Sequence, residues 1–247
     1  MALVLDGLCK RFDNSEKDTL HEIDLEVKTG EFVCIVGASG CGKSTLLNLV
    51  AGLERPSQGK VLLDGEEVIK PGADRTVMFQ EHGLFPWLSV LENVKFGMRM
   101  AGFSKEEQDK KAQHYLEMVK LWDYRDYQIH QISGGMRQRT ALARSLTMES
   151  KVLLMDEPFS ALDKQTSNRL REELQRIWME TKQTILFITH SVEEAVYLAD
   201  RVVVLSPDSG KVAEIVTVEL PRPRHVYAPE FVELRHRILE EVRGEAV

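Results

Sequence analysis

The residues best able to do chemistry form a glycine-rich loop near the N-terminus. Residues 37–44, Gly-Ala-Ser-Gly-Cys-Gly-Lys-Ser, fit the pattern G-x-x-x-x-G-K-[ST]. Its glycines let backbone N–H groups wrap a phosphate at the positive end of the following helix. Lys43 would neutralise the β- and γ-phosphates of a nucleotide, and the Ser44 hydroxyl would reach Mg²⁺. The apolar run 32–36 before the loop and the helical pattern 45–50 after it supply the required strand and helix.

Two carboxylates follow another apolar run. Asp156 ends the run 152–155, where its carboxylate can reach Mg²⁺ or its water shell. Glu157 comes next, points in a different direction, and can orient or deprotonate an attacking water during phosphoryl transfer. An Asp-Glu pair alone is more often a solvated loop. The phosphate loop favours the catalytic interpretation.

A Ser-Gly-Gly turn lies between these two motifs. Ser133 is a typical N-cap residue, and Gly134 and Gly135 leave backbone N–H groups open at a helix start. In a purely structural interpretation, Ser133 only caps this helix. The glycine-rich loop already provides one anion site. A second site, in a separate part of the chain, would need a second phosphate, which a partner molecule would supply.

The composition is that of an ordinary globular chain. The 247 residues are 43% hydrophobic and 29% charged, which suits one large α/β domain with an adequate core. A net charge of -7 without a basic stripe argues against a nucleic-acid surface. No segment approaches the ~18 apolar residues of a membrane span, and the start lacks secretory-signal features. Three cysteines without metal-ligand spacing favour a reducing, cytoplasmic compartment.

Short apolar strands alternate with helical patterns, which predicts a mainly parallel sheet. Core strands are expected at residues 32–36, 77–79, 152–155, 184–189 and 202–205. The Asp64-Gly65 pair predicts a hairpin in an antiparallel flank. The pattern from 84 to 146 is helical, with a capping box at Ser104 and Glu107, and predicts an inserted lobe.

Apolar stripes mark three helices. The stripe of the helix after Ser104 consists of Ala112, Tyr115, Leu116 and Val119. The stripe of a helix near 168–180 consists of Leu170, Leu174, Ile177 and Trp178. The stripe of a last helix, after Pro221 and Pro223, consists of Phe231, Leu234, Ile238, Leu239 and Val242.

The ordered motifs resemble the ATP-binding subunits of ABC transporters. The resemblance covers essentially the whole chain, through residues 37–45, Gln80, 133–135, 156–157, 160–163 and His190. It implies a single α/β nucleotide-binding domain over 1–247, of the P-loop NTPase class. This class has a RecA-like mixed sheet core, an antiparallel β flank and an inserted helical lobe. The implied bounds are 1–83 and 147–220 for the core, about 84–146 for the lobe and about 221–247 for a C-terminal helix. Two such cassettes would face each other head to tail and sandwich two ATP molecules with Mg²⁺.

The resemblance also implies residue roles. Gln80 would couple the γ-phosphate and Mg²⁺ to the helical lobe, His190 would contact the γ-phosphate, and Asp163 would communicate between the two sites. Phe12 would stack on adenine, although a phenylalanine there could equally be core, and His190 alone suits a structural strand end. The catalytic set is Glu157, His190, Gln80 and Lys43, and the metal set is Ser44, Gln80 and Asp156. The nucleotide set is Gly37, Ala38, Ser39, Gly40, Cys41, Gly42, Lys43, Ser44, Thr45, Phe12, Ser133, Gly134, Gly135 and Asp163.

Two positions depart from the usual pattern. Met136 stands where many family members carry Gln, which leaves the backbone donors unaffected. Cys41 lies within the loop at a helix N-terminus, where the pKa of a thiol tends to fall. We therefore expect Cys41 to be alkylated readily and to be protected by ATP.

The segment 79–90, which follows the core strand ending at Gln80, is unusually apolar and aromatic. It could pack inside the helical lobe, or it could form a docking cleft for a short cytoplasmic helix of a membrane permease. Together with 91–94 and the ending 220–235, it resembles the importer branch for nitrate, sulfonates and taurine. The implied partners are a second ATPase subunit, permease subunits and, indirectly, an extracytoplasmic solute-binding protein, with no nucleic acid. The chain would lie at the cytoplasmic face of the inner membrane.

Other classes of protein fit the sequence less well. An exporter-coupled or non-transport ABC ATPase is the alternative. A DNA-maintenance ATPase would carry a long coiled coil before Ser133, and a ribosome-acting protein would hold two cassettes. A small-molecule P-loop kinase would lack the Ser-Gly-Gly turn.

Overall fold

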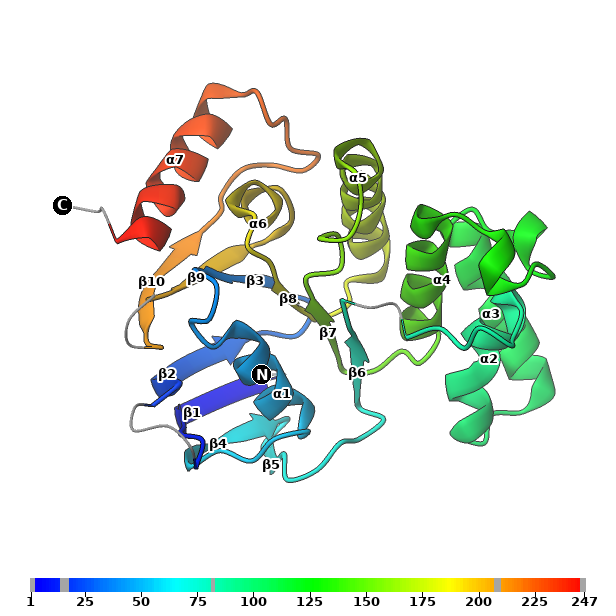
Figure 1. The fold of residues 1–247 in the computed structure, drawn as a ribbon, viewed down its shortest axis with the longest axis horizontal. Coiled ribbons are helices and arrows are strands. Elements are labelled where there is room, and N and C mark those ends of the chain that lie inside the picture. Colours follow the sequence, from blue (N-terminus) through cyan, green and yellow to red (C-terminus); the bar gives the residue numbers. More distant parts are fainter. Residues whose placement is uncertain (1–2, 14–17, 81–82, 207–209, 245–247) are drawn as a thin grey trace. The chain divides into compact units, whose positions relative to one another are not determined.

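The structure is a computed structural model that describes residues 3–13, 18–80, 83–206 and 210–244. Residues 81–82 of the predicted aromatic segment and 245–247 of the predicted C-terminal helix therefore lie outside the described residues. The chain forms two compact units, and Figure 1 labels their elements. Unit 1 comprises Met1–Gly72 and Lys182–Val247, and unit 2 comprises Ala73–Thr181.

Unit 1 contains an antiparallel sheet with the strand order β2-β1-β4-β5. Its strands are β1 (Leu3–Lys10), β2 (Leu20–Val27), β4 (Gln58–Leu63) and β5 (Glu66–Glu67). Asp64 and Gly65 join β4 to β5 with φ values of 50° and 86°, the left-handed conformation of a tight hairpin turn. The predicted hairpin and antiparallel flank are confirmed.

The second group of strands in unit 1 surrounds β3 (Phe32–Gly37), every residue of which is buried. β3 pairs in parallel with β8 (Ile185–Ile188) on one side and with β9 (Arg201–Leu205) on the other. Burial on both faces explains their continuous apolar sequences. The sequence did not predict β10 (Val212–Thr217), which pairs antiparallel with β9.

The helices of unit 1 are α1 (Lys43–Ala51), α6 (Val192–Leu198) and α7 (Pro229–Arg243). α1 packs on β3 and β8, and α7 lies against α6, β9 and β10 (Figure 1). Phe231 and Ile238 of α7 are buried as predicted. The prediction for Leu239 is wrong, because the one-residue step from Ile238 turns its side chain toward solvent.

Unit 2 begins with β6 (Arg75–Met78), which pairs in parallel with β7 (Val152–Asp156). The helices between them, α2 (Val90–Met100), α3 (Lys105–Met118) and α4 (Gly134–Leu146), pack on one another. Two single turns, η1 (Trp122–Tyr124) and η2 (Ile129–Gln131), lie between α3 and α4, and α5 (Lys164–Thr181) follows β7.

Local capping explains where these helices begin. The backbone N–H of Glu107 donates to Ser104 Oγ at 3.3 Å, and Ser104 N–H donates to Glu107 Oε2 at 2.9 Å. This confirms the predicted capping box, and Ser89 with Glu92 forms a second box, at the start of α2, that was not predicted. The predicted stripes are buried, namely Ala112, Tyr115, Leu116 and Val119, and Leu170, Leu174, Ile177 and Trp178.

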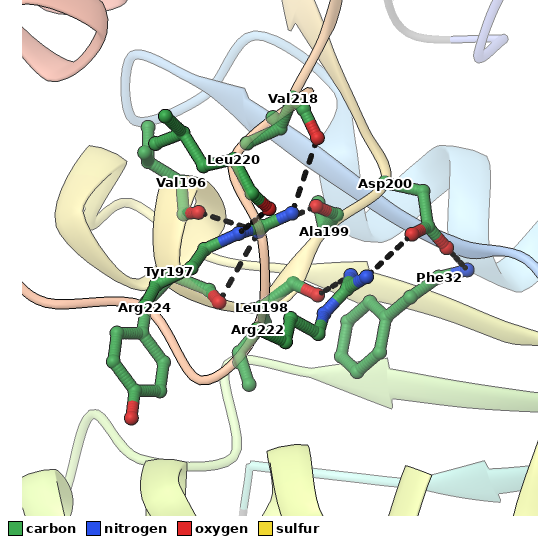
Figure 2. Close-up of polar contacts among 10 residues, drawn as sticks. All are labelled: Phe32, Val196, Tyr197, Leu198, Ala199, Asp200, Val218, Leu220, Arg222 and Arg224. Carbon is green, nitrogen blue, oxygen red and sulfur yellow. Dashed lines mark hydrogen bonds and ion pairs between the residues drawn. The ribbon is translucent and has the colours of Figure 1, made fainter. Parts of the chain in front are cut away.

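Two arginines close the C-terminal end of α6 (Figure 2). The buried Arg224 guanidinium donates to five carbonyl oxygens, with the shortest bonds, 2.7 Å, to Val196 and Ala199. Burial and the neighbouring Arg222 lower the pKa of Arg224 to about 10. Arg222 donates to Asp200 Oδ1 at 2.7 Å, and Asp200 Oδ2 accepts from Phe32 N–H at 2.9 Å. The clamp therefore ties the segment before α7 to the start of β3.

No helix among the described residues is both long and apolar enough to cross a membrane.

Replacing Arg224 with methionine should destabilise the fold by roughly 3 kcal/mol, because buried carbonyl groups lose a charged donor. Urea unfolding followed by circular dichroism measures the change. Arg235→Met is the matched control, since Arg235 forms a partly exposed pair with Glu193 at 3.2 Å. Such pairs contribute about 1 kcal/mol or less. Equal unfolding midpoints for the two variants would contradict the clamp.

Candidate functional site

The glycine-rich loop of unit 1 connects β3 directly to α1. Gly42 caps α1 with a φ of 101°, a conformation that favours glycine. A Cβ atom on Gly42 would lie 2.7 Å from Leu20 Cδ2 and 2.9 Å from Thr19 O, so no other residue fits without displacing the chain. The turn leaves the first N–H groups of α1 without partners inside the helix, which suits an anion.

Lys43 is positioned by the loop itself. Its side chain is buried, and Nζ donates to Gly37 O at 3.0 Å and Ala38 O at 2.8 Å. Ser39, Gly40 and Ser44 are exposed along the loop, and Thr45 is half-buried in the first turn of α1. The loop therefore presents a fixed cation, backbone donors and a hydroxyl, which is the chemistry that binds a phosphate.

The expected fall in the pKa of Cys41 is wrong. Its side chain is buried and packs toward β3, so that a Cβ on Gly37 would meet Cys41 Sγ at 2.7 Å. Burial raises the pKa of this thiol and outweighs the opposing effect of the Lys43 ammonium. The position of Cys41 near a helix N-terminus did not predict the pKa of its thiol, because the side chain points into the buried interior.

His190 lies at the same sheet edge as the loop. β3 and β8 are parallel with Ile35 opposite Ile188, and Thr189 N–H donates to Ile35 O at 3.2 Å. The carboxyl ends of the two strands are therefore neighbours. His190, exposed two residues beyond β8, stands beside the loop's strand as the motif order predicted.

Phe12 is a surface residue, so the core alternative is wrong. Its side chain is 39% exposed, and Lys10 Nζ lies 4.8 Å from the ring centroid. The ring lines a cavity of about 530 Å³ together with Cys9, His21, Ser57 and other polar residues. An exposed aromatic ring beside such a cavity can stack on a planar ligand.

In unit 2, the register of the strands brings Gln80 and Asp156 to the same edge of the sheet. Met78 pairs with Met155, so Gln80 and Asp156 follow adjacent parallel strands at one sheet edge. Glu157, half-buried, has a φ of 43°, which is uncommon for a residue with a side chain. Ser160 donates to Glu157 O from Oγ at 2.9 Å and from its backbone N–H at 3.2 Å. Backbone strain of this kind is typical of functional positions. The sequence did not predict the hydrogen bonds from Ser160 that hold this turn.

Ser133 caps α4 as predicted. Its Oγ accepts from Met136 N–H at 3.3 Å. A Cβ on Gly135 would lie 2.8 Å from Thr166 Cγ2, so glycine is needed for close packing of α4 on α5. At Gly134 a Cβ would meet only Leu162, at 3.8 Å. The start of α4 thus leaves backbone N–H groups of the kind that suit an anion.

Asp163 caps the N-terminus of α5. Its Oδ1 accepts from the backbone N–H groups of Gln165 and Thr166, both at 3.0 Å. Hydrogen bonds from the Thr166 side chain and backbone lower the pKa of this exposed carboxyl. Asp163 is therefore an ionised N-cap, which the motif alone did not indicate.

The chain is similar to known proteins over most of its length. A family model described as "ABC transporter" matches residues 20–160. The nitrate import ATP-binding protein NrtD of Synechocystis is 51% identical over 202 residues, 82% of this chain and 76% of that protein. The aliphatic sulfonates import ATP-binding protein SsuB of Bacillus cereus is 40% identical over 243 residues, 98% and 96% of the two chains.

A solved structure has the same fold. It is a dimeric, post-hydrolysis state of an ATP-binding cassette bound to ADP and Pi, with a TM-score of 0.74 and 29% identity. The match covers 89% of this chain and 100% of that one. The P-loop NTPase fold class predicted from the motifs is confirmed.

Cys41 should label at least ~10-fold more slowly with iodoacetamide at pH 8 in the folded chain than in guanidinium, because burial removes both access and thiolate. Mass spectrometry of the Cys41 peptide measures the rate. Mg-ATP should leave the slow rate unchanged. Labelling at the unfolded rate, with protection by ATP, would restore the original expectation.

Proposed function

The chain belongs to the ABC transporter family of ATP-binding proteins, and from this premise we propose that it powers import of a small solute through a membrane permease. The chain is an ATPase. Its likeness to import subunits named for nitrate and for aliphatic sulfonates carries the proposal, because it extends over most of the chain. The solute is of the nitrate, sulfonate or taurine kind.

The residues of unit 1 hold the nucleotide. The loop 37–45 surrounds the phosphates with backbone N–H groups, and Lys43 exchanges its loop carbonyls for phosphate oxygens. His190 contacts the γ-phosphate from the neighbouring strand end. Phe12 stacks on the adenine beside the cavity that it lines.

The groups of unit 2 act on the attacking water. Glu157 orients this water and takes up its proton, as a carboxylate can. The left-handed backbone at Glu157, held by Ser160, fixes the direction of the carboxylate relative to β7. Gln80, at the end of β6, senses the γ-phosphate and transmits its presence toward the helices that follow.

The donor set suits Mg²⁺. Ser44, Gln80 and Asp156 offer a hydroxyl, an amide and a carboxylate, which are the hard oxygen ligands that Mg²⁺ prefers. Among the described residues, no group of three His, Cys, Asp or Glu side chains could hold a metal alone. This agrees with an ion whose remaining ligands are phosphate oxygens and water. When bound, Mg²⁺ would neutralise charge on the phosphates.

A second cassette completes each ATP site. The start of α4 presents N–H groups at Ser133, Gly134 and Gly135 that receive the γ-phosphate of ATP held by a partner subunit. Asp163, the N-cap of α5, communicates between the two sites because α5 packs on α4. An identical chain is the simplest partner.

The aromatic segment after Gln80 meets the permease. Phe85 packs inward on Phe96, with ring centroids 4.2 Å apart, whereas Trp87 rests on Phe85 and is 72% exposed. Phe85 therefore fits the packing interpretation, and the exposed Trp87 supports the proposed docking. An exposed tryptophan backed by a packed ring is a typical hot spot for a partner helix.

The permease places the chain at the cytoplasmic face of the inner membrane. An extracytoplasmic binding protein delivers the solute on the other side, so this chain need not contact it. Tagging the chain in its native host and identifying what co-purifies from mild detergent tests the proposal. A multi-spanning permease with a solute-binding protein is expected. Recovery with an exporter's membrane domain, or without any membrane protein, would contradict it.

Glu157→Gln should lower kcat for ATP by about 10²–10⁴-fold and leave ATP binding nearly unchanged, because only proton transfer is lost. Steady-state ATPase kinetics and nucleotide binding measure the two quantities. Glu106→Gln, on the exposed first turn of α3, is the control and should behave as wild type. A wild-type rate in Glu157→Gln would show that Glu157 is not the base.

Trp87→Ala should weaken permease capture by about 2 kcal/mol, or ~30-fold, because a central anchor is removed. The basal ATPase rate should not change. Tyr227→Ala removes another exposed aromatic ring, in unit 1, and should bind the permease normally. Pull-down against a dilution series of permease measures the affinity, and equal capture by both variants would contradict this docking site.

A further inference from the structure

Unit 2 contains a charged cavity that the proposed function does not use. Its volume is about 320 Å³, within the lower range of small-molecule sites. The lining residues come from α4, from α5 and from the segment after α3. They are Lys120, Arg139, Arg169, Glu172, Glu173 and Arg176.

The cavity is positive although the chain is acidic. Four cationic side chains face two carboxylates, in a chain whose net charge is -7. Arg176 is bonded to Glu180 at 2.9 Å and to Met118 O at 2.8 Å. Within the described part of the chain, Lys120 and Arg169 make no side-chain hydrogen bond or ion pair. With Arg176 paired with Glu180 and Arg139 beside Glu173, these two cations face Glu172, so the lining keeps a net positive charge.

The remaining cation, Arg139, is incompletely satisfied. Its Nε lies 2.9 Å from Glu173 Oε2, and the Glu173 side chain is 8% exposed. Both atoms are buried, yet neither has a hydrogen-bond partner among the described residues, so the pair is close but poorly aligned. Burial raises the pKa of Glu173. The Arg139 side chain is 26% exposed, so its guanidinium can improve its bonding by donating to an oxoanion as a further partner.

We propose that this cavity binds a small ligand bearing a doubly charged oxoanion, such as a sulfate or phosphate group. Lys120 and Arg169, opposed by Glu172, leave a net positive charge that favours an anion. The planar guanidinium of Arg139 and the exposed one of Arg169 provide the forked donors that oxoanions bind in pairs. The cavity is too small for an extended acidic chain.

The ligand would join the two helices that carry the partner contacts. Arg139 lies on α4, which begins at the Ser-Gly-Gly turn, and Arg169 lies on α5, which begins after Asp163. An anion held by both arginines braces α4 against α5. The binding step itself does not depend on transport, so its failure would leave the proposed function standing.

Calorimetric titration of the full chain with sulfate tests the site, with saturating Mg-ADP present to occupy the glycine-rich loop. Wild type should show saturable binding with a Kd of about 1 mM or below. The double variant Lys120→Gln/Arg169→Gln should bind at least ~10-fold more weakly, because it removes the two cations that leave the lining positive. Both residues are exposed, so the fold should persist, and a thermal melt checks this.

Lys110→Gln on α3 is the control for loss of a surface positive charge, because Lys110 is exposed and does not line the cavity. It should bind sulfate as wild type does. No saturable heat up to about 50 mM sulfate would overturn the proposal, since such weak association is not a site. Equal affinity of wild type and the double variant, or equal loss in Lys110→Gln, would also overturn it.

Discussion

The proposed function depends on phosphate recognition by backbone N–H groups at the first turn of two helices. α1 begins after Gly42, whose left-handed φ of 101° turns the chain, and α4 begins after Ser133. These donors belong to the main chain and are present whatever the side chains are. The side chains need only cap the helix and leave space for the ligand. Met136 in place of the common glutamine therefore leaves this chemistry intact. Each unit carries one of these two helix starts, so in the proposed function a single chain supplies two half-sites.

Parallel strands then decide which side chains accompany each half-site. In unit 1, pairing of β3 with β8 sets His190 beside the strand that leads into the loop. In unit 2, pairing of β6 with β7 sets Gln80 beside Asp156 and Glu157. Loops that leave the carboxyl ends of adjacent strands share one edge, so residues far apart in the sequence come together there. Strand register alone does not set the direction of the Glu157 carboxylate. The tight turn at Glu157, held by Ser160, sets it.

Local features were predictable from the sequence, and features set by packing were not. The loop, the Asp64-Gly65 hairpin and the Ser104 capping box depend on residues close in sequence, and the structure contains all of them. The Cys41 prediction failed because the pKa of a thiol follows burial, which a helix position does not reveal. The arginine clamp and the cavity between α4 and α5 join distant residues, so no sequence window contains them. The strand β10 was missed because its partner, β9, defines it more than its own pattern does.

The central claim is that two chains share each ATP site. The most direct test is to measure the molar mass of the Glu157→Gln variant in solution with Mg-ATP. Light scattering after gel filtration should give a dimer, because ATP is retained between the cassettes. Adding Gly134→Asp should keep ATP binding but return the monomer, since its carboxylate repels the partner's γ-phosphate. The fold should accept this change, because a Cβ at Gly134 meets only Leu162, at 3.8 Å. A Glu157→Gln variant that stays monomeric at saturating ATP, or a double variant that still dimerises, would contradict the account.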